Sequence, residues 1–124
     1  MRHTGRAVIS EEDLSVEQCV SVYGGSFGSI CTRLHANVYA AIQSVPPVAI
    51  SYNPKVSEFM SWLDCNELVI DLEDFSPDGI IEKLEKSIIK RSEFREKIDK
   101  RIEEGRSHVV QYADIIMELI DAEN

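Results

Sequence analysis

Short apolar runs alternate along this chain with segments whose apolar residues recur at helical spacing, and that alternation limits the fold most. Residues 48–50 and 68–70 contain no polar side chain, a pattern typical of strands buried on both faces of a parallel sheet. Helical segments follow both runs, so crossover units and a parallel sheet are expected. Because such crossovers are right-handed, helices should cover both faces. The sequence therefore predicts a three-layer, Rossmann-like α/β domain.

Further elements are predicted upstream of these runs. Residues 7–9 form a short apolar run and predict a strand. Ser15, with Gln18 three residues later, fits a capping box and predicts a short helix. A weak strand is expected over 26–30, before a helix capped by Thr32 that should run to about residue 43.

The later helices carry clear start signals. Asn53 and Pro54, and again Ser76 and Pro77, fit a cap followed by proline at the first helical position. A last long helix should open near Ser92, with a possible bend at its glycine. Its apolar stripe comprises Phe94, Ile98, Ile102, Val109, Ala113, Ile116 and Leu119 or Ile120. We expect one domain over 1–124, with the sheet and crossovers in 7–91 and the long helix in 92–122.

Composition excludes several function classes. The chain has 13 Lys and Arg against 22 Asp and Glu, a net charge of −9, which disfavours nucleic acid as a partner. No apolar segment is long enough to span a membrane, and the basic residues 1–6 lead into acidic sequence instead of a signal core. The three cysteines fit neither a disulfide framework nor a metal site. Reduced thiols, no metal and a cytoplasmic location are expected.

Basic side chains stand where two helices should begin, each just after a short apolar run. Arg33 and His35 follow the first run, and Lys55 follows the second. A helix N-terminus disfavours cations unless an anion lies between them and the free N–H groups. The arrangement therefore indicates a phosphate or carboxylate site at the carboxyl ends of two strands, with Ser51 and Tyr52 supplying hydroxyls. Spacing alone leaves open that Arg33 is solvated, His35 buried and Lys55 an ordinary surface lysine.

These residues also resemble a known signature. Arg33-Leu34-His35-Ala36, then Val45-Pro46, then Ser51-Tyr52-Asn53-Pro54-Lys55 are similar to the C-terminal motifs of the polysaccharide pyruvyl transferase family. The acidic loop at 71–74 and the charged terminal helices look like that family too, so the resemblance spans roughly 8–120. Two departures stand out: Cys31-Thr32 replaces the family's Gly-Met, and Ser44 replaces the glycine of its G-V-P motif.

The resemblance implies the C-terminal half of a GT-B-like architecture, whose cleft lies between two Rossmann-like halves. The implied donor is phosphoenolpyruvate, without a further cofactor, and the product is a pyruvate ketal on a saccharide acceptor. The resemblance places His35 at the donor, as general acid toward the enol carbon or as a group that stabilises the departing phosphate. Arg33, in the same motif, is the second catalytic candidate, either beside the donor or orienting the site from behind. The implied substrate-binding residues are Lys55, Leu34, Tyr52, Ser51 and Asn53. The family's N-terminal half, which completes the cleft, could be carried by a separate chain, and a homo-oligomer is the other expected assembly. Turnover by this chain alone stays open.

Two other functions remain as alternatives. The chain could be a non-catalytic remnant or interaction domain that binds a phosphorylated ligand. It could instead be the nucleotide-sugar-binding half of a GT-B-type glycosyltransferase. Phosphoenolpyruvate binding that depends on His35 and Lys55 would favour the pyruvyl transferase half over both of these alternatives.

Overall fold

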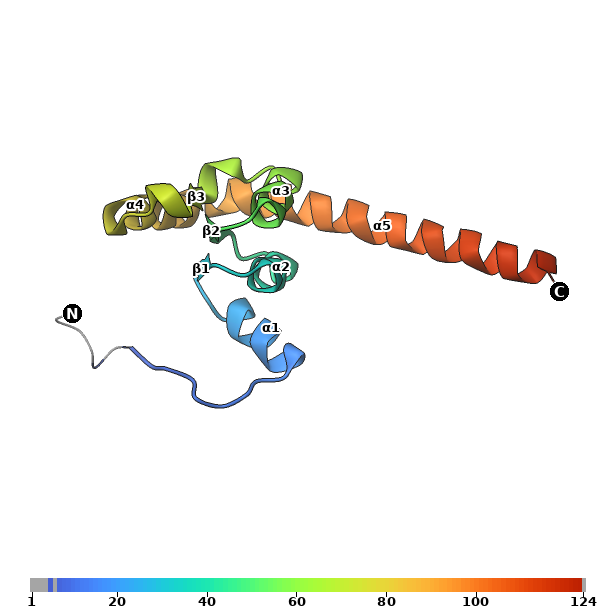
Figure 1. Cartoon of the computed structure of the whole chain (residues 1–124), viewed down its shortest axis with the longest axis horizontal. Helices are drawn as coiled ribbons and strands as arrows, with labels where there is room; N and C mark the ends of the chain where they lie inside the picture. Colours follow the sequence, from blue (N-terminus) through green and yellow to red (C-terminus); the bar gives the residue numbers. More distant parts are fainter. Residues whose placement is uncertain (1–4, 6, 124) are drawn as a thin grey trace.

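The computed structural model of the chain describes residues 5 and 7–123; most of the basic N-terminal segment therefore lies outside the described residues. It contains a three-stranded sheet of β1 (Ser29–Cys31), β2 (Pro47–Ser51) and β3 (Val69–Asp71), in that order (Figure 1). Both strand pairs are parallel, with Cys31 opposite Ala49 and Ser51 opposite Asp71. The parallel sheet predicted from the apolar runs is confirmed.

Helices flank this sheet on both sides. The crossovers contain α2 (Leu34–Ile42) and α3 (Pro54–Trp62), which pack against β2 on the same side (Figure 1). Because the strand order advances in one direction, right-handed crossovers place both helices on one face. The next helix, α4 (Pro77–Ile89), contacts β2 from the other side. The chain is thus a mixed α/β protein with a small parallel sheet.

The core lies between the sheet and the helices α2, α3 and α5 (Arg91–Glu123). All five residues of β2 are buried, as expected for a central strand. The main apolar cluster comprises Ala41, Ala49, Val56, Met60, Leu63, Cys65, Leu68, Phe94 and Ile98. Phe94 and Ile98 are the buried residues of α5, so these two side chains anchor the long helix to the domain.

The predicted capping chemistry is confirmed at three helices. Ser15 and Gln18 form a reciprocal capping box at α1 (Val16–Gly24), with N···O distances of 2.9 and 3.2 Å. Asn53 Oδ1 accepts the Lys55 N–H at 2.7 Å, and Ser76 Oγ accepts the Gly79 N–H at 3.0 Å. Each bond satisfies an N–H that the helix itself leaves unpaired.

Three local predictions are wrong. Residues 7–9 form no strand, and Val8 is 95% exposed, because no strand among the described residues lies beside this isolated apolar triplet to pair with it. The strand expected over 26–30 begins later and ends one residue beyond that range, at Ser29–Cys31. The cap of α2 is Arg33 and not Thr32, and no side chain accepts a hydrogen bond there.

Ser44, at the end of α2, adopts a backbone conformation that is unusual for a residue with a side chain. Its φ is 58°, in the left-handed region that favours glycine and costs other residues about 1–2 kcal/mol. The Ser44 hydroxyl donates a hydrogen bond to Asp99 Oδ1 on α5. This bond ties the end of α2 to the long helix and offsets part of the backbone cost.

The long helix α5 begins at Arg91, one residue before Ser92, and continues through Gly105 to Glu123. Gly105 serves a close approach and not a bend, because a Cβ there would lie 3.3 Å from the Trp62 ring. Beyond Ile102 the predicted apolar stripe is exposed, and the helix extends away from the sheet (Figure 1). No described helix is long and apolar enough to cross a membrane.

The three cysteines are free thiols, and their environments predict different reactivities. Burial raises the pKa of Cys65 to about 11 and also raises the pKa of Cys31 above its usual value. Because the thiolate is the nucleophile, we expect both to resist iodoacetamide at about pH 8 in the folded protein and to react in urea. Counting adducts by mass spectrometry measures this. Rapid labelling of Cys65 without denaturant would contradict it, and half-buried Cys19 is the internal comparison.

Candidate functional site

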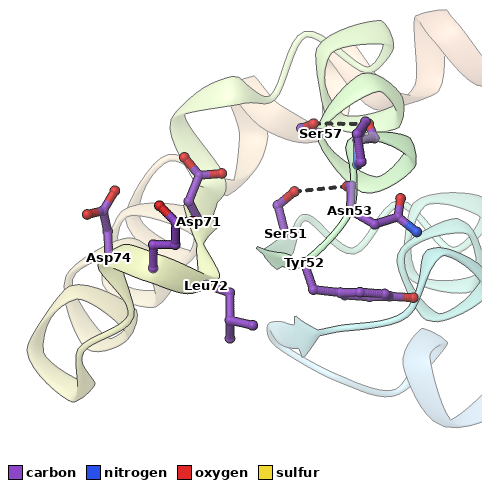
Figure 2. Close-up of a pocket in the computed structure, with 9 residues that line it drawn as sticks. Ser51, Tyr52, Asn53, Ser57, Asp71, Leu72 and Asp74 are labelled. Carbon is purple, nitrogen blue, oxygen red and sulfur yellow. Dashed lines mark hydrogen bonds between the residues drawn. The ribbon is translucent and has the colours of Figure 1, made fainter.

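An open cleft of about 450 Å³ lies at the carboxyl ends of β2 and β3 (Figure 2). Ligands of open parallel sheets bind at this edge. The cleft is lined by Ser51, Tyr52, Asn53, Pro54, Ser57, Asp71, Leu72, Glu73 and Asp74. Three of the predicted substrate-binding residues, Ser51, Tyr52 and Asn53, therefore share one cleft.

One wall of the cleft comes from the end of β2 and the first turn of α3. Ser51 is buried, and its Oγ donates to the Asn53 carbonyl at 3.1 Å. Ser57 Oγ donates to the Pro54 carbonyl at 3.0 Å (Figure 2). These bonds fix the turn between strand and helix. Tyr52 remains 52% exposed, and its ring points away from Asp71 and Asp74 (Figure 2).

The opposite wall is acidic. Asp71 ends β3, and Glu73 and Asp74 lie in the 3-10 turn η3 (Leu72–Asp74) that follows it. Figure 2 shows Asp71 and Asp74 across the cleft from Ser51 and Tyr52. No site role was predicted for these carboxylates from the sequence. The signal was available, because they follow the apolar run at 68–70 and parallel strands end at a common edge.

Arg33, Leu34 and His35 lie at the start of α2, next to β1 and outside the lining of this cleft. Arg33 and His35 are exposed, and the His35 ring lies 6.3 Å from the Tyr39 ring. Leu34 is half-buried and packs against the main core cluster. Within the described chain, neither the guanidinium of Arg33 nor the imidazole of His35 makes a hydrogen bond or ion pair.

The N-terminus of α2 differs from those of α1, α3 and α4 because no side chain caps it. Its first turn holds no acidic residue. The first N–H groups of a helix need external acceptors, and they attract anions. An anion could therefore be bound by backbone N–H groups here, with Arg33 and His35 at its side.

Lys55 lies at the second position of α3, exposed and free of side-chain ion pairs among the described residues. Its N–H is already taken by Asn53, so the ammonium group is what it can offer to a ligand. Lys55 does not line the cleft. Convergence of Arg33, His35 and Lys55 on one ligand stays a prediction.

Asn37, for which no role was predicted from the sequence, supports the start of α2. It is fully buried, and its Nδ2 donates to the Arg33 carbonyl at 2.8 Å. Its Oδ1 is buried without a hydrogen-bond partner. Asn37 therefore fixes the backbone that carries Arg33. Its mid-helix position among apolar residues gave no distinctive signal in the sequence.

The site combines two unlike environments along one sheet edge. Exposed cations and an uncapped helix start lie beside β1 and β2. Three carboxylates, two hydroxyl residues and an aromatic ring line the cleft beside β2 and β3. The first environment suits an anionic group, whereas the second offers acceptors and a ring face to a ligand rich in hydroxyls. No described cluster of three His, Cys, Asp or Glu is placed to hold a metal ion.

No family model, curated protein or solved structure matches this chain.

Proposed function

We propose that this chain is the C-terminal, phosphoenolpyruvate-binding half of a polysaccharide pyruvyl transferase. The observation that carries the proposal is that both resembled motifs follow adjacent parallel strands. Arg33-Leu34-His35-Ala36 follows β1, and Ser51-Tyr52-Asn53-Pro54-Lys55 ends β2 and starts α3. In this proposal the small sheet belongs to a three-layer, Rossmann-like domain of a GT-B-like enzyme in the cytoplasm.

The donor's two anionic groups match two helix starts. Phosphate and carboxylate would be bound by the uncapped N–H groups of α2 and by the exposed Arg33 and Lys55 side chains. The carboxylates of the cleft repel an anion, so the donor belongs on the α2 side. The acceptor saccharide then belongs beside Tyr52 and Asp71, where hydroxyls can donate to carboxylate oxygens.

The proposed reaction adds two acceptor hydroxyl oxygens to C2 of the enolpyruvyl group. The C2–O bond to phosphate breaks, phosphate departs, and the methylene C3 gains a proton to become a methyl group. Of the two hydroxyl protons released, one balances the proton gained by C3 and the other leaves with phosphate. His35, which is exposed and makes no hydrogen bond within the described chain, is our candidate to deliver the proton to C3.

A second candidate is the nucleotide-sugar-binding half of a GT-B-type glycosyltransferase. The specific observation that favours it is the acidic, hydroxyl-bearing cleft, because carboxylates at this edge can accept hydrogen bonds from ribose or sugar hydroxyls. It needs a site for a diphosphate, for which the start of α2 is again the candidate.

Calorimetric titration of the full chain with phosphoenolpyruvate tests the first proposal. We expect His35→Ala and Lys55→Ala each to weaken binding roughly tenfold or more, because each removes a charge-assisted contact to the ligand. The matched controls are His108→Ala and Lys100→Ala, exposed residues of α5 that should leave the affinity unchanged.

The ligands distinguish the candidate functions. Binding of a nucleotide-sugar in preference to phosphoenolpyruvate would favour the glycosyltransferase half. Phosphoenolpyruvate binding that survives both substitutions would contradict the assigned site. Absence of binding to either compound by a folded chain would contradict both proposals and favour an interaction domain.

A further inference from the structure

The end of α5 exposes an unusually broad apolar surface. Eight large apolar side chains between residues 109 and 120 are 49–67% exposed: Val109, Val110, Tyr112, Ile115, Ile116, Met117, Leu119 and Ile120. Polar residues recur instead along one narrow stripe, at Gln111, Asp114, Glu118 and Asp121. A helix with so wide an apolar face is normally buried against a neighbour. The segment 106–123, which we name the α5 tail, extends beyond the domain (Figure 1).

The spacing of this surface is self-complementary. Val109, Ala113, Ile116 and Ile120 are separated by four, three and four residues, the spacing of a coiled-coil seam. In an antiparallel pair centred between residues 114 and 115, Val109 faces Ile120 of the second copy. In the same pair, Ala113 faces Ile116 of the second copy. A symmetric two-fold interface needs this kind of self-matching surface.

We propose that the α5 tail pairs in antiparallel orientation with the α5 tail of a second copy of this chain. The proposal does not depend on the function of the sheet edge. Apolar residues also flank the seam on both sides, at Val110 and Met117 and at Tyr112 and Leu119. They widen the interface beyond the seam itself.

Charge complementarity favours the antiparallel orientation. The tail begins with Arg106 and ends with Asp121 and Glu123. Antiparallel pairing brings Arg106 beside Glu123 of the second copy at each end, whereas parallel pairing would align like charges. A tail of 18 residues is about 27 Å long. Antiparallel pairing therefore also places the folded domains of the two copies at opposite ends of the interface. Because each chain has a net charge of −9, this separation reduces their mutual repulsion.

The available area is sufficient for a dimer. The eight exposed apolar side chains carry on the order of 800 Å² of open surface, close to what each partner contributes to a standard interface. Burial of apolar surface favours association, and this gain offsets the cost of ordering two chains in one complex. The proposed second copy thus covers the seam and the apolar residues that flank it.

Sedimentation equilibrium of the full chain over a roughly hundredfold concentration range tests the pairing. We expect a monomer–dimer equilibrium that Ile116→Asp weakens roughly a hundredfold, because two unpaired carboxylates would be placed in the seam of each dimer. The matched control is Gln111→Asp, which adds the same charge on the polar stripe and should leave the dimer intact.

A charge exchange tests the orientation without altering the seam. Arg106→Glu should weaken the dimer roughly two- to tenfold, and Arg106→Glu combined with Glu123→Arg should restore it. A wild-type chain that is monomeric throughout would overturn the proposal and assign the surface to a different protein or domain. A dimer affinity that Ile116→Asp leaves unchanged would overturn the proposal as well. If Arg106→Glu combined with Glu123→Arg does not restore the dimer affinity, the antiparallel orientation is wrong.

Discussion

Replacement of Phe94 by alanine is expected to lower the free energy of unfolding by about 3–5 kcal/mol, the usual cost of deleting a large buried side chain. Phe94 is 1% exposed and belongs to the main core cluster. It is also one of the two buried residues of α5. The substitution therefore leaves a cavity beneath the sheet and removes half of the anchor that holds the long helix.

Urea denaturation followed by the fluorescence of Trp62 measures this loss, because Trp62 is the single tryptophan and stacks on Phe59 beside the core. The matched control is Arg95→Ala, at the next position of the same helix, where the side chain is exposed. It should change stability by no more than about 0.5 kcal/mol. A Phe94→Ala variant as stable as this control would show that α5 is not held by the core.

The second large effect is expected for Asn37→Asp, a substitution of almost identical shape. Asn37 is fully buried, and its Oδ1 is unpaired. An aspartate there would place a negative charge away from water, at a cost of about 3 kcal/mol or more at neutral pH. The Nδ2 donor to the Arg33 carbonyl is lost as well, so we also expect disorder at the start of α2.

The pH dependence of the free energy of unfolding of Asn37→Asp distinguishes the cost of a buried charge from an effect of side-chain shape. Burial would raise the pKa of the new carboxyl above its unfolded value, so the folded state keeps its proton to higher pH than the unfolded state. The stability deficit relative to wild type should be small below the unfolded pKa, about 4, and should grow as pH rises through the folded pKa. The control is Asn66→Asp at an exposed position. A deficit that is constant between acidic and neutral pH would contradict this explanation.

Much of the fold follows from local sequence signals. The capping box at Ser15 and the Asn53-Pro54 and Ser76-Pro77 starts are contained within a few residues, so they could be predicted without knowledge of the fold. The central strand was equally clear, because β2 is apolar up to its last residue. The triplet at 7–9 was misassigned, since a strand requires a pairing partner that its own residues do not specify.

Only part of the candidate site could be predicted from the sequence. Ser51 and Tyr52 were selected as neighbours of a basic helix start and Asn53 through the resembled motif, and all three line the cleft. Asp71 and Asp74, from a segment some twenty residues later, line the same cleft. Their pairing with Ser51 depends on the β2–β3 register, in which Ser51 lies opposite Asp71.

The sequence by itself determined the succession of strands and helices, the caps that start most helices, and the basic residues placed after β1 and β2. These features depend on contacts within a few residues of each other. The tertiary structure alone decided that β3 pairs with β2 so that Asp71 lies opposite Ser51. It also decided that Asn37 supports Arg33 from inside the core, and that α5 is buried near Phe94 but exposed beyond Ile102. The physical reason is that burial depends on what lies opposite a side chain: the apolar stripe of α5 continues with the same spacing, but the domain that covers it ends.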